Sequence, residues 1–224
     1  MDEGRRSLIA VSAAIVRQDR VALVAVLDEA AAAVRAVHAD REDEPAVTAH
    51  AVEEAILQSH LFVGYPAMIQ ALTAWRERVA GPAVPASPVD PQLWERRGET
   101  VCARVYGGQY RRLRENITRL HPDLDRWMVV DGYGRVLGRP GLDLATRELC
   151  IVALLCAQDA PQQLYSHLRG SLNAGAALDE VEATIRLATA GLPPERIDAT
   201  WRTWQAVKAR AAGDGGADAT EAHG

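Results

Sequence analysis

The sequence predicts an all-α protein. Ala, Leu, Val and Arg dominate its 224 residues, and aromatic residues make up only 5%. Such side chains lose little rotamer freedom in a helix, so this composition favours helices over sheets. No segment sustains the apolar–polar alternation of a half-buried strand. Apolar residues instead recur at spacings of three and four, which marks core-facing helical stripes. One such stripe is Leu23, Val26, Leu27, Ala30 and Val34.

The first 80 residues are expected to form an N-terminal helical unit. Thr48 is the expected N-cap of its third helix, because a Thr hydroxyl can accept a hydrogen bond from an early backbone N–H. A charged loop at 38–46 precedes this cap, and Gly64 and Pro66 end the helix. The expected helices are Ser7–Val16, Arg20–Val37, Thr48 to about Val63, and Ala67–Val79.

A Pro-rich linker at 81–92 is expected to separate this unit from a second one at 93–210. The linker holds four prolines and one glycine. The glycine-rich stretch 133–141 is expected to be a turn region. The small, polar residues 211–224 are expected to form a disordered tail. The expected helices of the second unit are Leu93–Tyr106, Gln109–Leu120, Pro122 to about Gly132, Leu142–Cys156, Gln162–Asn173, Asp179–Thr189 and Arg196–Arg210.

Charge and motif content exclude several classes of protein. The formal charge of −5 argues against a general nucleic-acid binder. No run approaches the roughly 18 apolar residues of a membrane helix, and acidic residues near the N-terminus make a poor signal peptide, so a cytoplasmic protein is expected. Three cysteines without a CxxC predict buried free thiols. The absence of HExxH, HxxxH and phosphate-loop motifs predicts no metal and no cofactor.

Residues 6–80 align with 147–210 as an internal repeat. The helix-breaking signals fall in the same order in both halves, which favours a duplication over chance. A pseudo-two-fold helical unit then places sites where the halves meet. The matched positions are Arg6 with Arg147, Leu8 with Leu149, Asp19 with Asp159, Leu23 with Leu164, Val52 with Val181, Gly64 with Gly191, Pro66 with Pro193, and Trp75 close to Trp204.

Three segments resemble the carboxymuconolactone decarboxylase family. They are 139–185, which contains Arg-Pro-Gly-Leu-Asp and His-x-x-Gly; 52–72, which contains Gly-Tyr-Pro-Ala; and 96–107, which contains Arg-Gly. The order of these segments is rearranged relative to the family. The resemblance implies the alkylhydroperoxidase D-like all-α fold with two pseudo-repeated halves. It also implies a small-molecule substrate and a homo-oligomer, a trimer or hexamer.

Departures from the family's motifs bear on the activity. The thiol peroxidases of the family carry a Glu, two cysteines and a His, which correspond here to Glu148, Ala160, Gln163 and His167. Because neither Ala nor Gln forms a thiolate, peroxide reduction is disfavoured. The decarboxylases carry Glu-Leu-x-x-His, where this chain has Gln163. Gln keeps hydrogen bonding but removes a possible proton carrier.

Decarboxylation of a lactone acid without a cofactor needs a cation, an electron sink and a proton donor. Arg147 or Arg139 is a candidate for the cation, because a guanidinium fork matches a carboxylate. His167 is the candidate acid–base group, and Glu148 the candidate to orient it. Glu148 also suits a structural role at a helix start. Replacing a pocket residue such as His167 is expected to abolish turnover with little change in stability.

The remaining candidate substrate-binding residues are Gln163, His60 and Tyr65. His60 and Tyr65 lie in the first half and would reach the same cavity from the other repeat, although His60 also suits a structural role. Three functions stay open: a decarboxylase-like lyase that uses His167, an alkylhydroperoxidase-like antioxidant, and a catalytically silent helical ligand-binding oligomer.

Overall fold

The computed structural model describes residues 1–40, 48–79 and 86–221. Every regular element within these ranges is helical, which confirms the predicted fold class. None of the described helices is both long enough and apolar enough to cross a membrane. The α-helices are α1 (Glu3–Arg17), α2 (Arg20–Asp40), α3 (Ala49–Arg76), α4 (Pro91–Tyr106), α5 (Tyr110–Leu120), α6 (Pro122–Trp127), α7 (Leu144–Gln158), α8 (Pro161–Ala174), α9 (Leu178–Thr189) and α10 (Pro194–Glu221). A 3₁₀ turn, η1 (Gly107–Gln109), precedes α5, and a π-helix, η2 (Met128–Leu137), follows α6.

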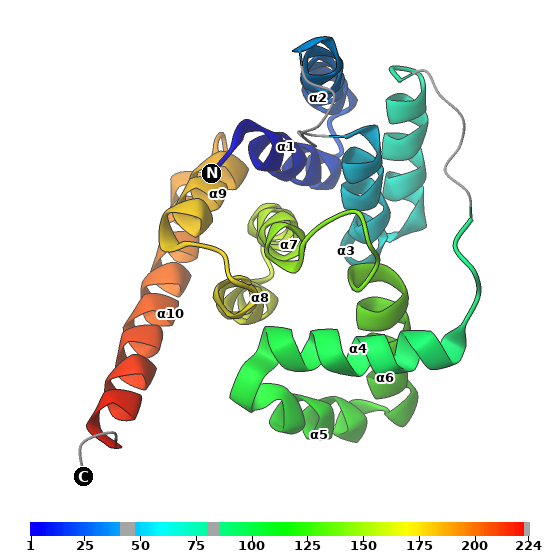
Figure 1. The fold of residues 1–224 in the computed structure, drawn as a ribbon. Helices are drawn as coiled ribbons and strands as arrows, with labels where there is room; N and C mark the ends of the chain where they lie inside the picture. Colours follow the sequence, from blue (N-terminus) through cyan, green and yellow to red (C-terminus); the bar gives the residue numbers. More distant parts are fainter. Residues whose placement is uncertain (41–47, 80–85, 222–224) are drawn as a thin grey trace.

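Helix α7 lies at the centre of the molecule (Figure 1). It packs against α1, α3, α8 and α9, and every residue from Ala145 to Cys156 is buried. A helix buried on all sides has no polar face, which explains its nearly continuous apolar sequence. Polar side chains of α7 that project into this core therefore need partners from the helices around it.

The predicted repeat has matching features in the two halves. Helices α1 and α7 are capped by Asp2 and Asp143, whose side chains accept hydrogen bonds from backbone N–H groups three residues on. Both helices end in a left-handed residue, Gln18 with φ 52° and Asp159 with φ 62°. Later in each half, a fully buried tryptophan, Trp75 or Trp204, packs into the core.

The expected break near Gly64 is a kink within α3. Gly64 adopts φ 76° and ψ 171°, and Pro66 follows it inside the same helix. A positive φ strains residues with a Cβ atom, so glycine suits this position. The Thr48 cap upstream is confirmed, because its hydroxyl accepts a hydrogen bond from the N–H of Ala51.

The expected turn region at 133–141 is wrong over its first half, since the π-helix η2 continues to Leu137. Gly134 of η2 is a contact point with α4. A Cβ atom on Gly134 would lie 1.9 Å from the carbonyl oxygen of Trp94, and one on Gly98 would lie 2.0 Å from that of Val129. Gly134, in the expected turn region, and Gly98, in an expected helix, therefore let α4 and η2 cross closely.

The remaining differences concern segment ends. Helix α2 reaches Asp40, and the rest of the expected charged loop, 41–46, lies outside the described residues. Within the expected linker, 81–85 lie outside the described residues, 86–90 have no regular structure, and α4 begins at Pro91. Helical backbone continues to Glu221, where a disordered tail was expected, and 222–224 lie outside the described residues.

Candidate functional site

A buried carboxylate–imidazole pair joins the two central helices. Nδ1 of His167 on α8 lies 2.8 Å from Oε2 of Glu148 on α7. Glu148 is fully buried, and His167 is 7% exposed. The Asp143 cap sets where α7 begins, and Pro161 opens α8, so the starts of both helices fix which side chains meet. The structure thus brings together two of the predicted catalytic residues.

Helix α8 leaves space for the Glu148 carboxylate at Gly170, one turn after His167. A Cβ atom at Gly170 would lie 2.8 Å from Oε2 of Glu148 and 2.7 Å from Cγ1 of Val105 on α4. Both distances are shorter than a Cβ contact allows. The absence of a side chain at Gly170 therefore lets the carboxylate lie directly against α8.

The hydrogen bond from Nδ1 determines how the His167 ring is presented. A carboxylate accepts hydrogen bonds, so Nδ1 carries the hydrogen and Nε2 is the nitrogen left to exchange a proton. Nε2 forms no hydrogen bond within the described part of the chain. The ring of Phe62 on α3 meets the imidazole edge to face, with centroids 5.9 Å apart. The ring is therefore held from two sides, which suits an acid–base group.

A cysteine and two tyrosines near Glu148 are protonated at neutral pH. Oε1 of Glu148 is buried and has no hydrogen-bond partner among the described residues. Burial raises the pKa of Cys102 and of Tyr106 to about 12, and the nearby Glu148 charge adds to both shifts. Burial also raises the pKa of Tyr133, whose ring meets that of Tyr106 edge to face at 6.1 Å. Cys102, Tyr106 and Tyr133 are therefore neutral at pH 7.

Arg147 and Arg139, the predicted cations for a substrate carboxylate, both pair with Glu54 of α3. Nη2 of Arg147 lies 2.8 Å from Oε2 of Glu54, and Nη2 of Arg139 lies 2.8 Å from Oε1. Arg147 also contacts the side chain of Gln58 and two backbone carbonyls. The structure does not bring Arg147 to the Glu148–His167 pair, although the two residues are adjacent in sequence.

The other three predicted site residues also lie apart from the pair. Gln163 is exposed on the first turn of α8. Nδ1 of His60 bonds the carbonyl oxygen of Leu57 at 2.7 Å, and its ring lies 5.1 Å from that of Tyr65. Tyr65 is exposed. His60 and Tyr65 form a local contact on α3, and Phe62 is the residue of this segment that reaches His167.

The cysteines have the predicted character of buried free thiols. Cys102, Cys150 and Cys156 are all free and buried. Burial raises the pKa of Cys150 to about 11 and that of Cys156 to about 12. Since the thiolate is the reactive form, none of the three is poised as a nucleophile.

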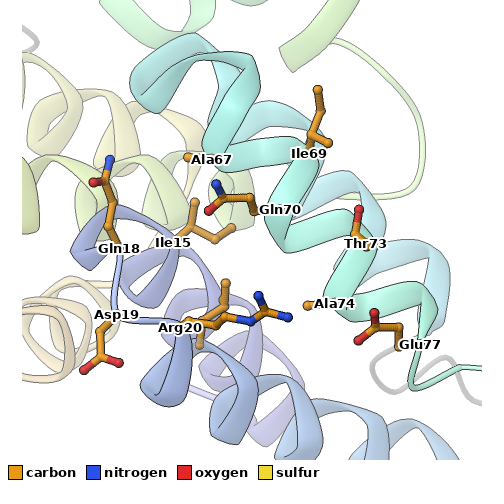
Figure 2. Close-up of a pocket in the computed structure, with 11 residues that line it drawn as sticks. Ile15, Gln18, Asp19, Arg20, Ala67, Ile69, Gln70, Thr73, Ala74 and Glu77 are labelled. Carbon is orange, nitrogen blue, oxygen red and sulfur yellow. The ribbon is translucent and has the colours of Figure 1, made fainter.

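One pocket lies between the α1–α2 turn and the second half of α3. It has a volume of about 190 Å³ and is drawn in Figure 2. Ile15 and Leu23 contribute apolar surface, and Arg20 extends across it from the start of α2 toward α3. None of the predicted site residues lines this pocket.

A second pocket, which we name the arginine pocket, lies between the α4–α5 connection and α8. Its volume is about 320 Å³, and its lining includes Tyr106, Arg112, Leu113, Tyr165, Arg169 and Asn173. Tyr106 connects the pocket to the surroundings of Glu148. His167, expected in a cavity, lines neither of these two pockets.

Sequence reasoning missed Phe62, Tyr106, Tyr133, Arg112 and Arg169. Phe62, Tyr106 and Tyr133 lie on α3, α4 and η2, and only tertiary packing brings them near the pair. Arg112 on α5 and Arg169 on α8 come together at the arginine pocket. Tyr106 had a weak signal, because it falls in the 96–107 segment.

Comparison with known proteins finds one family model and several similar proteins. The model of the carboxymuconolactone decarboxylase family matches residues 122–206, which contain Glu148 and His167. A 4-carboxymuconolactone decarboxylase from Acinetobacter baylyi is 33% identical over 101 residues, which cover 44% of this chain and 75% of that protein.

Two yeast proteins named peroxisomal protein 2 are also similar. The Schizosaccharomyces pombe protein is 28% identical over 141 residues, covering 61% of this chain and 66% of its own length. The Saccharomyces cerevisiae protein is 29% identical over 167 residues, covering 60% of this chain and 58% of its own length. The chain thus spans less than two thirds of these yeast relatives, and their name leaves the expected cytoplasmic location unconfirmed.

Proposed function

Because the chain belongs to the carboxymuconolactone decarboxylase family, we propose that it is a cofactor-free lyase for a small carboxylated lactone. His167 is the acid–base group, and Glu148 is the residue that positions it. The observation that carries this proposal is the 2.8 Å contact between His167 Nδ1 and Glu148 Oε2 in the core. A buried, oriented imidazole whose second nitrogen makes no hydrogen bond to any described residue is suited to proton transfer.

In the proposed reaction, the bond between the carboxylate carbon and the ring carbon breaks and carbon dioxide leaves. The electron pair moves into the unsaturated lactone, whose carbonyl is the electron sink. Protonated His167 then delivers its Nε2 proton to the carbon, and solvent restores that proton. Glu148 accepts the Nδ1 hydrogen throughout, which fixes the direction of Nε2.

Two observations weigh against the alternative of peroxide reduction. The positions that hold the two cysteines in the thiol peroxidases are Ala160 and Gln163 here. The thiol of Cys102, which lies near enough to Glu148 to respond to its charge, is also protonated, since burial raises its pKa to about 12. The other alternative is a catalytically silent ligand-binding oligomer. Absence of turnover with every substrate would favour this alternative.

The test is a carbon dioxide release assay with the purified protein. The first substrate is 4-carboxymuconolactone, named for the Acinetobacter relative, followed by other small carboxylated lactones. Turnover that disappears in His167→Ala supports the proposal. Peroxide consumption with a thiol reductant, or release of no carbon dioxide from any lactone, contradicts it.

The proposal includes a homo-oligomer, a trimer or hexamer. Apolar residues such as Leu61, Tyr65 and Ile69 recur at four-residue spacing on α3 and are exposed in the single chain. Light scattering should return a multiple of 24.3 kDa. A monomer at micromolar concentration would contradict this part of the proposal.

A further inference from the structure

We propose that the arginine pocket binds a small, flat organic anion that carries two carboxylate groups. This inference goes beyond the lyase activity and stands on different residues, Arg112 of α5 and Arg169 of α8. Nothing in the proposed proton transfer requires these side chains, so the two proposals can fail separately.

The pocket has the size and construction of a small-molecule site. Its volume of about 320 Å³ falls in the range of roughly 300–1,000 Å³ that small-molecule pockets occupy. Nδ2 of Asn173 donates a hydrogen bond of 2.8 Å to the carbonyl oxygen of Val105, which ties α8 to the end of α4. The pocket walls are therefore held together by a contact within the protein itself.

The charge of the pocket points to an anion. Among the described residues that line it, none is acidic, although the whole chain carries a formal charge of −5. Arg112 and Arg169 make no hydrogen bond or ion pair with any described residue, whereas Arg114 nearby is paired with Asp125. Arg112 and Arg169 both line this cavity, and an anion bound there would offset the repulsion between their like charges.

The remaining lining selects the shape of the anion. Tyr106, Tyr165 and Leu113 contribute rings and aliphatic surface, against which a flat unsaturated or aromatic body can pack. Each guanidinium presents parallel N–H donors that match one carboxylate. Two arginines on two helices thus favour two carboxylates on one planar framework over a single spherical ion.

The pocket adjoins the catalytic pair through one wall. Val105 and Tyr106 line the pocket. Val105 also lies at the Gly170 contact beside Glu148, and Tyr106 is close enough to Glu148 for its charge to raise the pKa of Tyr106. A bound anion therefore lies behind the wall that encloses the Glu148–His167 pair.

Isothermal titration calorimetry of the full chain with phthalate tests this inference. Benzamide serves as the neutral flat control, and sulfate as the inorganic one. Phthalate should bind, and Arg112→Gln and Arg169→Gln should each raise its Kd about tenfold or more, the loss of one charge-assisted contact. Arg111→Gln is the matched control on the same helix, because the Arg111 side chain is 92% exposed and is not among the residues that line the pocket. Circular dichroism checks that each variant folds. If Arg169→Gln does not fold, Arg169→Lys takes its place, because it keeps the positive charge but loses the guanidinium fork.

Each outcome decides the inference. Phthalate binding that is lost in both pocket variants and retained in Arg111→Gln supports it. Absence of phthalate binding, equal affinity in all variants, or equal affinity for benzamide or sulfate overturns it. Phthalate binding by a protein that decarboxylates no lactone would keep this inference and contradict the lyase proposal, and the reverse result would do the opposite.

Discussion

Gly170 and Glu148 are positioned so that a Cβ atom on the glycine would lie 2.8 Å from Oε2 of the carboxylate. Helix α8 therefore lies tightly against the Glu148 carboxylate where the polar pair is buried. A buried carboxylate is tolerated here because α8 supplies His167 as a partner and, one turn later, the space that the carboxylate needs.

Gly170→Ala should destabilise the protein and disturb the pair. The new methyl group overlaps Val105 and Glu148, and overpacking of this kind costs about 1–3 kcal/mol, which exceeds the helix propensity gained from alanine. Urea unfolding measures the loss. Gly108→Ala is the control, since a Cβ atom there meets nothing within 4 Å. Equal stability of the two variants would mean that α8 can move away from α7 at no cost.

Removing His167 should cost stability, contrary to the expectation from the sequence that it would not. His167→Gln takes away the one hydrogen bond of a fully buried carboxylate whose Oε1 already has no partner among the described residues. An unpaired buried charge costs about 3 kcal/mol or more. A double-mutant cycle that combines His167→Gln with Glu148→Gln should give a coupling energy between the two residues. The control is the same cycle with His60→Gln in place of His167→Gln, which should give none. Additive effects would show that the pair does not interact in solution.

Glu54 should make stability depend on acid pH. Burial alone would raise its pKa, but hydrogen bonds from Arg139 and Arg147 outweigh burial and lower the pKa below its ordinary 4.5. Its contribution is thus fully present above about pH 4.5 and is lost as the pH falls through the lowered value. Thermal melts from pH 7 to 3 should show a smaller acid loss in Glu54→Gln than in the wild type. Glu77→Gln, whose side chain is 62% exposed, should behave like the wild type.

The three thiols should be unreactive in the folded protein. Burial raises the pKa of Cys150 to about 11, and those of Cys102 and Cys156 to about 12, so thiolate is scarce at pH 8. Titration with an aromatic disulfide reagent should detect no thiol before denaturation and three after it. Rapid reaction of a native thiol would reopen the peroxidase interpretation.

The sequence predicted the helical elements and the Glu148–His167 pair, but not the partners of the arginines. The pair is 19 residues apart on consecutive helices, where family spacing is informative. Glu54 and Arg147 are 93 residues apart. No local sequence pattern indicates that the Arg147 guanidinium will form an ion pair with a buried glutamate so far along the chain. The π-helix was missed because Gly134 suggested a turn. In the structure this glycine instead permits close contact with the backbone of Trp94, which is distant in sequence.

The most direct test of the central claim is the kcat for carbon dioxide release, measured per folded molecule in the wild type, His167→Gln and Glu148→Gln. Loss of an acid–base group costs about 10²–10⁴-fold, so His167→Gln should fall by that factor on whichever carboxylated lactone the wild type turns over. The kcat of Glu148→Gln should fall less, because the amide oxygen can still accept the Nδ1 hydrogen and orient the ring. A His167→Gln variant with wild-type kcat would contradict the account.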